Sequence, residues 1–371
     1  PIIEAQIIET MVLLLLNHQS LIATKSTRIV SAAKGRPVME FGARRAHSID
    51  AAILGARAAV IGGCIGTSCT STAQKFGTIA SGTMAHSFVQ SFNSEYDAFK
   101  AYAEVYPDDC TLLIDTYDTI NSGVVNAIKV FNDVLLPKGY RPKAVRLDSG
   151  DLAYLSKKVR KMLDEAGFPD AVISASNDLD EYLIESLKLQ GAVITSWGVG
   201  TNLITAKDNP AFGGVYKLAA IRDENGTFIP KIKLSENTEK VTNPGNKTIY
   251  RIYDKNTGKI RADLICLVGE VFDPEEDMTI FDPNEPWKKT RLAGGSYTLR
   301  ELLVPVFKDG KCIYESPSVM EIQEICNKEK DTIWDETKRF VNPHEIHVDL
   351  SKKLYDLKND LLNELHNLQE D

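Results

Sequence analysis

The chain has 371 residues, of which 43% are hydrophobic and 25% are charged, and its formal net charge is -8 at pH 7. These values are typical of a globular protein of more than one domain, and they exclude the disordered and fibrous classes. Lysine and arginine are scattered along an acidic chain, whereas binding to a phosphate backbone requires a concentrated basic surface. We therefore expect no nucleic-acid partner.

The first 34 residues carry a helical pattern that contains the apolar run MVLLLL at residues 11–16. This run is shorter than the roughly 20 residues that span a bilayer, so it predicts a buried helix and no membrane association. The pattern is already under way at Pro1, which indicates that an N-terminal part is missing. Residues 1–34 are accordingly interpreted as the remainder of an N-terminal domain and a linking helix.

Residues 35–221 alternate short β-branched runs with amphipathic stretches in which apolar residues recur every three or four positions. Eight such runs with helices between them predict a closed parallel β/α barrel, TIM-like but irregular. The runs are PVMEF, AAVIGGCI, GTIAS, TLLID, KAVRL, AVISA, AVITSW and GVYKLAAI.

The remaining residues have a different texture. Short alternating runs with turn signals predict an antiparallel β-rich part over residues 222–305, which completes an accompanying α/β sandwich domain. Residues 306–371 read as a C-terminal extension of solvent-covered helices. His344 and His347 lie near a predicted helix start without completing a metal site, and six cysteines without a C-x-x-C pair indicate reduced thiols in a cytoplasmic protein.

The polar motifs of the barrel region directly follow its β-branched runs. Carboxyl-terminal strand ends form one face of a β/α barrel, and catalytic residues gather there because the loops converge. Any one of these motifs can equally be a turn or a helix cap, but seven of them share the predicted face. The motifs are GARRAH, GTSCTS, GTMAHS, DTYDT, DSGD, SNDLD and GVGTN.

Arg146 and Asp148 are two residues apart at the end of the run KAVRL, so their side chains point to the same side of a strand. A charged pair within an apolar strand is costly unless its members are paired or used. One interpretation is a salt bridge that closes the barrel interior. The other is an anion site, because the planar guanidinium of Arg146 matches a carboxylate or a phosphate.

Two loops rich in small residues, SNDLD and GVGTN, follow late strands of the barrel, where backbone N–H groups can surround a phosphate. His86 follows GTMA at an apparent helix start. A histidine there is either a satisfied capping group or a general base or phosphoryl carrier, since imidazole titrates near neutrality and can attack phosphorus.

Taken in order, the motifs FGARRAHS, GTSCTSTAQKFG, SGTMAHSFVQSF, LLIDTYDT, VRLDSGDL, SASNDLDE and WGVGTNLIT resemble those of nicotinate phosphoribosyltransferases, which are type II phosphoribosyltransferases. The resemblance covers roughly residues 1–260. It implies that nicotinate and 5-phosphoribosyl 1-diphosphate react, with hydrolysis of ATP, to give nicotinate mononucleotide and diphosphate in NAD salvage. It also implies that ATP phosphorylates His86.

The resemblance assigns further roles residue by residue. It gives Thr83 and Arg146 as nicotinate contacts and Thr201 as a phosphoribosyl-diphosphate contact, and it places five others around the phosphoribose: Asp148, Ser176, Asn177, Gly198 and Gly200. Asp148 can stabilise oxocarbenium-like charge or hold the Mg²⁺ that accompanies the diphosphate. Phe41 can stack on the pyridine ring beside Arg44, or it can be barrel core.

Ser68 bears on the choice between acid and amide substrates. The related nicotinamide phosphoribosyltransferases carry an aspartate at this position, which would repel a carboxylate ligand, so Ser68 favours nicotinate. Members of the family also carry about a further hundred residues before Pro1, with a tyrosine that stacks on the pyridine ring across a dimer interface. The resemblance thus implies a homodimer with shared active sites.

Two further functions remain open at this point. A quinolinate- or nicotinamide-type phosphoribosyltransferase would use similar barrel chemistry, although a diacid calls for more cationic residues than Arg146 alone. A catalytically silent barrel that acts as a binding protein is the alternative from another class, and the presence of His86, Arg146 and Asp148 weighs against it.

Overall fold

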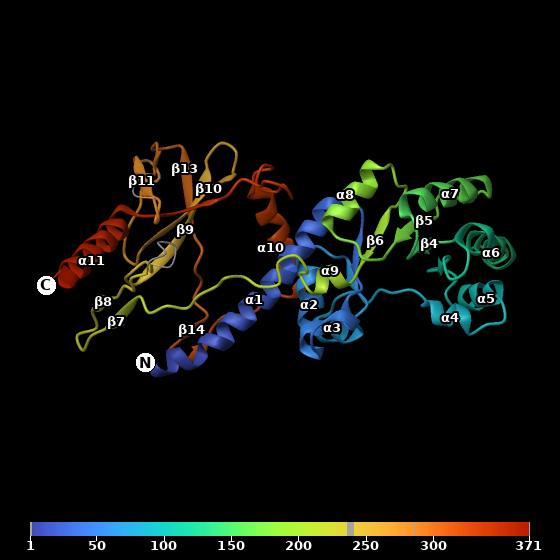
Figure 1. Ribbon diagram of the computed structural model, residues 1–371, viewed down its shortest axis with the longest axis horizontal. Helices are drawn as coiled ribbons and strands as arrows, with labels where there is room; N and C mark the ends of the chain where they lie inside the picture. The colour runs from blue at the N-terminus through green and yellow to red at the C-terminus, as the bar shows by residue number, and fades with distance from the viewer. Residues whose placement is uncertain (1, 236–240, 286, 371) are drawn as a thin grey trace. The chain divides into compact units, whose positions relative to one another are not determined.

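The computed structural model describes residues 2–235, 241–285 and 287–370, which form two compact units. One unit comprises residues 1–214 with 317–326, and the other comprises residues 215–316 with 327–371. The elements of both are labelled in Figure 1. Most contacts of each unit are made within that unit.

The first unit is built on a curled sheet of six parallel strands in the order β2-β1-β6-β5-β4-β3. Its central strands are largely buried on both faces, as expected for a parallel sheet that is covered by helices. The strands are β1 (Val38–Glu40), β2 (Gly66–Thr67), β3 (Thr111–Leu113), β4 (Ala144–Leu147), β5 (Val172–Ala175) and β6 (Ser196–Val199).

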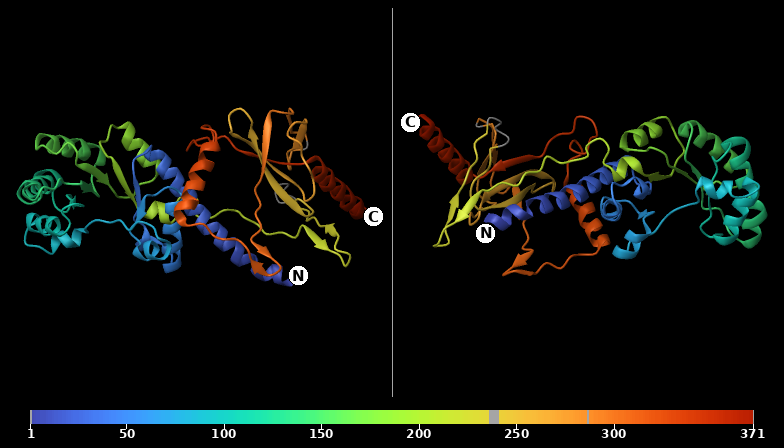
Figure 2. Two further views of the ribbon diagram at one scale, coloured as in Figure 1. Left: turned by 180° about the vertical axis from the view of Figure 1, so that it is seen from behind. Right: turned by 60° about the horizontal axis from the view of Figure 1, so that its bottom comes forward.

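Helices follow the strands, and those from α5 to α8 lie along the outer side of the curled sheet (Figures 1 and 2). Ser48, Ser94, Asp151 and Asp180 cap four of them by accepting a hydrogen bond from an amide three residues on, which fixes where each helix begins. The helices are α1 (Ile2–Ala33), α2 (Ile49–Ile61), α3 (Thr70–Phe76), α4 (His86–Gln90), α5 (Glu95–Val105), α6 (Val124–Val130), α7 (Leu152–Glu165), α8 (Glu181–Leu189) and α9 (Thr201–Ile204).

Four shorter helical segments complete this unit. Two of them are π-helical and flank α6, one on each side, and π-helical turns are often found at functional sites. The π-helical segments are Thr119–Gly123 and Phe131–Leu135, and the 3₁₀ segments are Ala43–Arg45 and Leu136–Lys138.

The sheet is an open half-barrel, so the prediction of eight strands in one closed barrel is wrong for the described residues. The first half of the run AAVIGGCI lies in the last turn of α2, because its alanines continue the helical spacing, and the second half is a turn that leads toward β2. The run GTIAS contributes a single bridge between Thr67 and Ala80. Only the last two residues of GVYKLAAI lie in a strand, β7 (Ala220–Arg222), which pairs with β8 (Phe228–Pro230) outside this sheet.

Helix α1 is confirmed as a helix, but its apolar run is not buried as predicted. Leu14, Leu15 and Leu16 are 54–64% exposed, and the buried residues of the helix begin at Leu21. By length and composition alone, α1 could cross a membrane: its most apolar window has a mean hydropathy of 1.4, and 11% of that window is buried. The buried residues of α1, from Leu21 to Ala33, lie in its carboxyl-terminal half, and the helix packs on α2 and α8.

The second unit holds a mixed sheet in the order β12-β11-β16-β10-β9-β13. The predicted antiparallel strands around residues 248–268 are confirmed as β9 and β10, whose alternating burial surrounds a core that includes Ile252, Leu264 and Ile280. The strands are β9 (Lys247–Asp254), β10 (Ile260–Leu267), β11 (Met278–Phe281), β12 (Lys289–Leu292), β13 (Tyr297–Glu301) and β16 (His347–Leu350), and a hairpin joins β14 (Phe307–Lys308) to β15 (Lys311–Cys312).

The last residues contain the helices α10 (Val319–Thr332) and α11 (Lys352–Glu370), with a strand between them that was not predicted. The strand is β16, which pairs in parallel with β10. His347 is its first residue, so the prediction that this histidine lies at a helix start is wrong, because the alternating residues of HVDL extend the sheet instead. The six cysteines are free.

Candidate active site

His86 is the first residue of α4 and projects toward the carboxyl ends of β3 and β4. Its Nδ1 lies 3.1 Å from the hydroxyl of Thr116. Its Nε2 lies 3.6 Å from Asp148 Oδ2 and 4.0 Å from Asp115 Oδ1, and the histidine side chain is 38% exposed. The imidazole is therefore held by a hydroxyl on one nitrogen, faces two carboxylates with the other, and stays open to a ligand.

Asp115 is a site residue that sequence reasoning did not single out. It lies just past β3, and its Oδ2 accepts hydrogen bonds from the Asp148 amide at 2.8 Å and the Ser149 hydroxyl at 2.6 Å. Its Oδ1 is buried without a hydrogen-bond partner and faces His86. One signal in the sequence pointed to Asp115. It begins the motif DTYDT and lies two residues after Leu113, so in an extended strand its side chain points to the same face as that of Leu113.

Arg146 connects three loops through its guanidinium. Its Nη1 donates to Thr83 Oγ1 at 2.8 Å, its Nε donates to Ser176 Oγ at 2.8 Å, and its Nη2 donates to Asp148 Oδ1 at 2.9 Å. The side chain is 17% exposed, so the charge is largely removed from water and kept by these partners. The structure thus joins Arg146 to the His86 cluster through Asp148.

Asp148 lies between the cation and the imidazole. Burial alone would raise its pKa, but the hydrogen bond from Ser176, the charge and hydrogen bond of Arg146 and the proximity of His86 outweigh burial and lower the pKa from its usual 3.8. Asp148 is consequently an anion at neutral pH, beside His86 and at the mouth of the half-barrel.

Phe41 follows β1 and packs beneath the guanidinium of Arg146, whose Cζ is 5.5 Å from the ring centroid. Gly198 makes room for this ring: a Cβ at Gly198 would lie 2.6 Å from Phe41 Cδ2 and Cε2 and 3.5 Å from Ser176 Cβ. A Cβ at Gly200 would lie 3.3 Å from the Phe41 carbonyl oxygen. Gly198 therefore lets the end of β6 lie against the ring, and Gly200 lets the following turn lie against the Phe41 backbone.

The loops after β5 and β6 are fastened to each other by Asn202. Its buried side-chain amide donates to the carbonyl oxygens of Asp178 at 2.8 Å and Leu179 at 3.2 Å. Asn177 has a φ of +112°, a backbone conformation that is strained for any residue other than glycine. Such strain often persists where a loop is shaped for a ligand, and here it orients the exposed backbone of residues 177 and 178.

The other predicted residues surround this cluster at its edge. Arg44 is exposed on the 3₁₀ turn after β1, and Ser68 is exposed after β2, with its amide donating to the Glu40 carbonyl at 2.9 Å. Thr201 is half-buried as the first residue of α9. The structure brings Thr83, His86, Arg146, Asp148 and Ser176 into one connected network, and it leaves the side chains of Arg44, Ser68 and Thr201 on adjoining loops.

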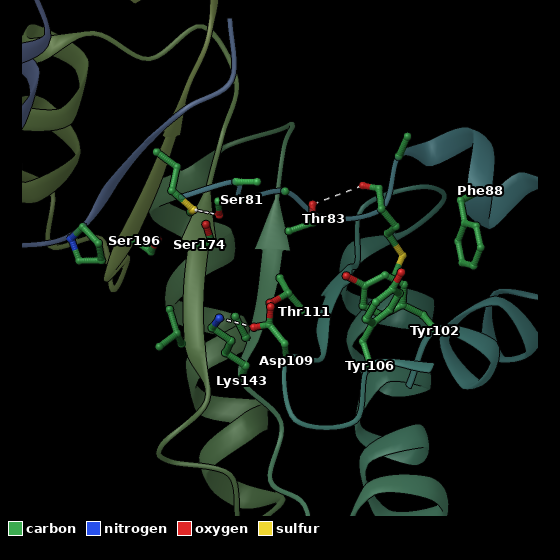
Figure 3. Close-up of a pocket in the computed structure, with 18 of the residues that line it drawn as sticks. Ser81, Thr83, Phe88, Tyr102, Tyr106, Asp109, Thr111, Lys143, Ser174 and Ser196 are labelled. Carbon is green, nitrogen blue, oxygen red and sulfur yellow. Dashed lines mark hydrogen bonds and ion pairs between the residues drawn. The ribbon is translucent and has the colours of Figure 1, made fainter. Parts of the chain in front are cut away.

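A cavity of about 1250 Å³ lies inside the half-barrel, toward the amino-terminal ends of its strands. Figure 3 shows the aromatic side chains of Phe88, Tyr102 and Tyr106 on one side of this space and the small side chains of Ser174 and Ser196 on the other. Thr83 also lines the cavity. Because Thr83 accepts a hydrogen bond from Arg146, this space adjoins the network at the strand ends.

Comparison with known proteins agrees with this geometry. Residues 37–248 match the model described as "Nicotinate phosphoribosyltransferase (NAPRTase) family", and residues 246–358 match "Nicotinate phosphoribosyltransferase C-terminal domain". The chain belongs to the nicotinate phosphoribosyltransferase family. All the residues of the network lie within the first of these matches.

Individual relatives carry the same family name. The chain is 45% identical over 368 residues to a nicotinate phosphoribosyltransferase of Bacillus subtilis, which covers 98% of this chain and 73% of that protein. It is 47% identical over 251 residues to the nicotinate phosphoribosyltransferase pncB2 of Mycobacterium tuberculosis, covering 68% of this chain and about half, 52%, of that protein.

A solved structure shows the same architecture. The crystal structure of human nicotinic acid phosphoribosyltransferase has a TM-score of 0.82 to this chain at 25% identity, covering 97% of this chain and 78% of that one. The mixed α/β fold with a curled parallel half-barrel is thus that of the nicotinate phosphoribosyltransferase family.

Proposed function

We propose that this chain is an ATP-dependent nicotinate phosphoribosyltransferase of the ligase class. In the proposed reaction, nicotinate, 5-phosphoribosyl 1-diphosphate, ATP and water give nicotinate mononucleotide, diphosphate, ADP and phosphate. The observation that carries this proposal is the connected network of His86, Asp148 and Arg146 at one end of a half-barrel of this family. A phosphoryl acceptor and an anion-binding cation adjoin there.

His86 is the phosphoryl carrier in this proposal. The carboxylates of Asp115 and Asp148 favour the proton on Nε2, which they face at 4.0 and 3.6 Å, so the free lone pair of the neutral imidazole is on Nδ1. Nδ1 attacks the γ-phosphorus of ATP, the bond to the ADP oxygen breaks, and ADP leaves. Water later hydrolyses the phosphohistidine to phosphate and restores His86.

Arg146 binds the nicotinate carboxylate. Its guanidinium is already oriented by Ser176 and Asp148, and its Nη1 reaches Thr83, which a carboxylate can share or displace as a partner. Phe41 supplies an aromatic surface for the pyridine ring, with Arg44 on the adjoining turn. Ser68, in place of a carboxylate, leaves the acid substrate without a repelling charge.

The sugar diphosphate occupies the loops after β5 and β6. Thr201, Gly200, Gly198, Ser176 and Asn177 offer hydroxyls and backbone amides to its phosphates. Among the described residues, no group of three or more His, Cys, Asp or Glu side chains is placed to hold a metal ion. Asp115 Oδ1, which has no hydrogen-bond partner, and the carboxylate of Asp148 fit Mg²⁺ that arrives with the diphosphate, because Mg²⁺ takes one or two carboxylates together with phosphates, whose charge it neutralises.

The finer predictions from the resemblance belong to the same proposal. The enzyme would act in the cytoplasm on small molecules alone, as a homodimer whose active sites are shared, and with no nucleic-acid or membrane partner. The helices after residue 306 would extend the accompanying domain.

Labelling with γ-³²P-ATP tests the proposal. We expect acid-labile, base-stable label on the wild-type protein and none on His86→Ala, whereas His344→Ala, in the other unit, should label like the wild type. Turnover of nicotinate with 5-phosphoribosyl 1-diphosphate should depend on ATP in the same way. Wild-type protein that takes up no label and does not consume nicotinate would refute the proposed function.

A further inference from the structure

Glu40 is the last residue of β1 and has a buried carboxylate that the proposed chemistry does not use. Its neighbours Met39 and Phe41 point into the half-barrel, so the alternation of the strand turns the Glu40 side chain to the opposite face. The residue is 0% exposed. A carboxylate in such a position is retained only if its oxygens are well satisfied.

Both carboxylate oxygens of Glu40 accept hydrogen bonds from loops at the site. Oε1 accepts from the Gly42 amide, and Oε2 accepts from Thr67 Oγ1 at 2.6 Å. Thr67 Oγ1 in turn accepts from the Cys69 amide at 2.9 Å. Burial raises the pKa of Glu40, and the hydrogen bonds from Thr67 and Gly42 oppose that rise. The donors named here are neutral backbone and hydroxyl groups and none is a cation. The carboxylate of Glu40 therefore links the two loops through hydrogen bonds and not through an ion pair.

The junction ends on the segments that carry the proposed nicotinate contacts. Gly42 lies between Phe41 and the 3₁₀ turn that contains Arg44, while Thr67 and Cys69 flank Ser68. One carboxylate therefore fixes the start of the loop after β1 and the start of the loop after β2.

Gly42 also sets the distance to the loop after β6. A Cβ at this position would lie 2.6 Å from Ile204 Cβ and 2.7 Å from the Gly200 carbonyl oxygen, so the backbone here fits tightly against α9. A displaced Gly42 amide would change the spacing of Phe41 from Gly198 as well, because the Phe41 ring already fills the space next to that glycine.

We propose that Glu40 is a positioning residue that clamps the loops after β1 and β2 and thereby sets the geometry of the pyridine site. The inference deepens the proposed function and rests on it for the identity of the ligand. A purely structural role would lower stability without singling out one substrate. The clamp instead predicts a larger effect on nicotinate than on 5-phosphoribosyl 1-diphosphate, because Glu40 bonds directly to the loops after β1 and β2 and reaches the loop after β6 only through the packing of Gly42.

Four variants test the clamp. Glu40→Ala removes both acceptors, whereas Glu40→Gln keeps the shape and one acceptor oxygen. Thr67→Val removes the hydroxyl, and with it both the link to Oε2 and the acceptor of the Cys69 amide, and it covers the case in which Glu40→Ala does not fold. Glu181→Gln is the matched control, because Glu181 is also buried and bonded, but to Lys25 and Arg28 on α1.

The measurements are the KM for each substrate, kcat, phosphorylation of His86 and amide hydrogen exchange of residues 41–45 and 67–70. We expect Glu40→Ala to raise the KM for nicotinate about tenfold, with Glu40→Gln and Thr67→Val between it and the wild type. The KM for 5-phosphoribosyl 1-diphosphate should rise less than the KM for nicotinate, and the labelling of His86 should change less than twofold. Exchange in both loops should rise in Glu40→Ala and stay at the wild-type rate in Glu181→Gln.

The outcomes separate the clamp from the proposed function. Unchanged exchange in both loops of Glu40→Ala and Thr67→Val would overturn the clamp whatever the enzyme does. Faster exchange with an unchanged KM for nicotinate, or an equal rise of both KM values, would overturn its role in positioning the pyridine site. Wild-type protein without nicotinate turnover would overturn the proposed function, while hydrogen exchange would still decide the clamp.

Discussion

At the scale of the residue, Arg146 is the group whose chemistry depends most on shape. Its three nitrogens each donate to a different partner, on Thr83, Ser176 and Asp148. A lysine carries the same charge but cannot hold three fixed directions at once or pair with a carboxylate through two parallel bonds.

Arg146→Lys should therefore raise the KM for nicotinate at least tenfold, and Arg146→Ala should weaken nicotinate far more than nicotinamide. Steady-state kinetics with both pyridines measure the effect. Arg141→Lys is the control, because Arg141 forms an exposed ion pair with Asp170, and pairs of that kind contribute only about 0–1 kcal/mol. Equal losses for nicotinate and nicotinamide would mean that Arg146 acts through structure alone.

Asp148 gives a prediction about pH. Its pKa in the folded protein lies below the usual 3.8, because Ser176, Arg146 and His86 together outweigh burial. The stability that the charged form contributes is then complete above about pH 4 and is lost as the pH falls through the lower folded-state value. The free energy of unfolding, measured with urea across this range, should depend less on pH in Asp148→Asn than in the wild type.

Ser176→Ala provides the intermediate case for that experiment. It removes one hydrogen bond that favours the charged carboxylate but leaves the charge of Arg146 in place, so it should remove only part of the pH dependence. A wild-type profile in Asp148→Asn would show that other carboxylates govern the acid response.

Sequence reasoning selected residues at this scale where motif and strand spacing agreed. Arg146 lies in β4, Asp148 and Ser176 directly follow strands, and Thr83 and His86 follow the bridge at Ala80. The structure joins these residues into one network. Asp115 and Glu40 were not singled out, because their significance depends on contacts between strands that are distant in sequence. A buried glutamate between Met39 and Phe41 looks like ordinary alternation until Thr67 is placed beside it.

At the scale of the element, the π-helical turn Thr119–Gly123 fixes the strand end that carries Asp115. A Cβ at Gly123 would lie 1.7 Å from the Ile114 carbonyl oxygen, so the turn packs directly on the backbone just before Asp115. The backbone of Gly123 is helical, with φ of -57° and ψ of -59°, and an alanine there would be strained by contact alone.

Gly123→Ala should destabilise the protein by roughly 1–3 kcal/mol or more, because backbone cannot move aside as a side chain can. It should also lower the rate of His86 labelling, since Asp115 faces that imidazole. Urea unfolding and the labelling assay measure both effects. Gly213→Ala has no atom within 4 Å of the added Cβ and should change stability by less than about 1 kcal/mol. Similar behaviour of the two variants would contradict this account.

Helices were easier to predict than strands for a physical reason. The sequences of α7 and α8 are amphipathic, and capping aspartates, Asp151 and Asp180, precede them. The local sequence therefore determines both the type of element and the residue at which it begins. A strand of two or three residues, such as β2 or β3, is defined by its partners. Ala58 and Ala59 could therefore be assigned to a strand, although they lie in the last turn of α2. In the same way, β16 can be recognised as a strand only when its partner β10 is known.

At the scale of the whole molecule, every residue of the proposed site lies in the unit formed by residues 1–214 and 317–326. The other unit has its own core around Ile252, Leu264 and Tyr297. Two units with separate cores can unfold in separate transitions, and a ligand stabilises only the state to which it binds.

Calorimetry should therefore show two transitions, of which nicotinate with 5-phosphoribosyl 1-diphosphate raises only one. At ligand concentrations of 100 times Kd the gain is about 2.7 kcal/mol, which corresponds to roughly 5–10 °C for a unit of 150–250 residues. Leu264→Ala identifies the other transition, because loss of a buried leucine side chain costs about 2–5 kcal/mol there. A single transition would show that the two units unfold as one. An equal rise of two transitions with substrate would show that ligand binding also stabilises the unit that contains Leu264.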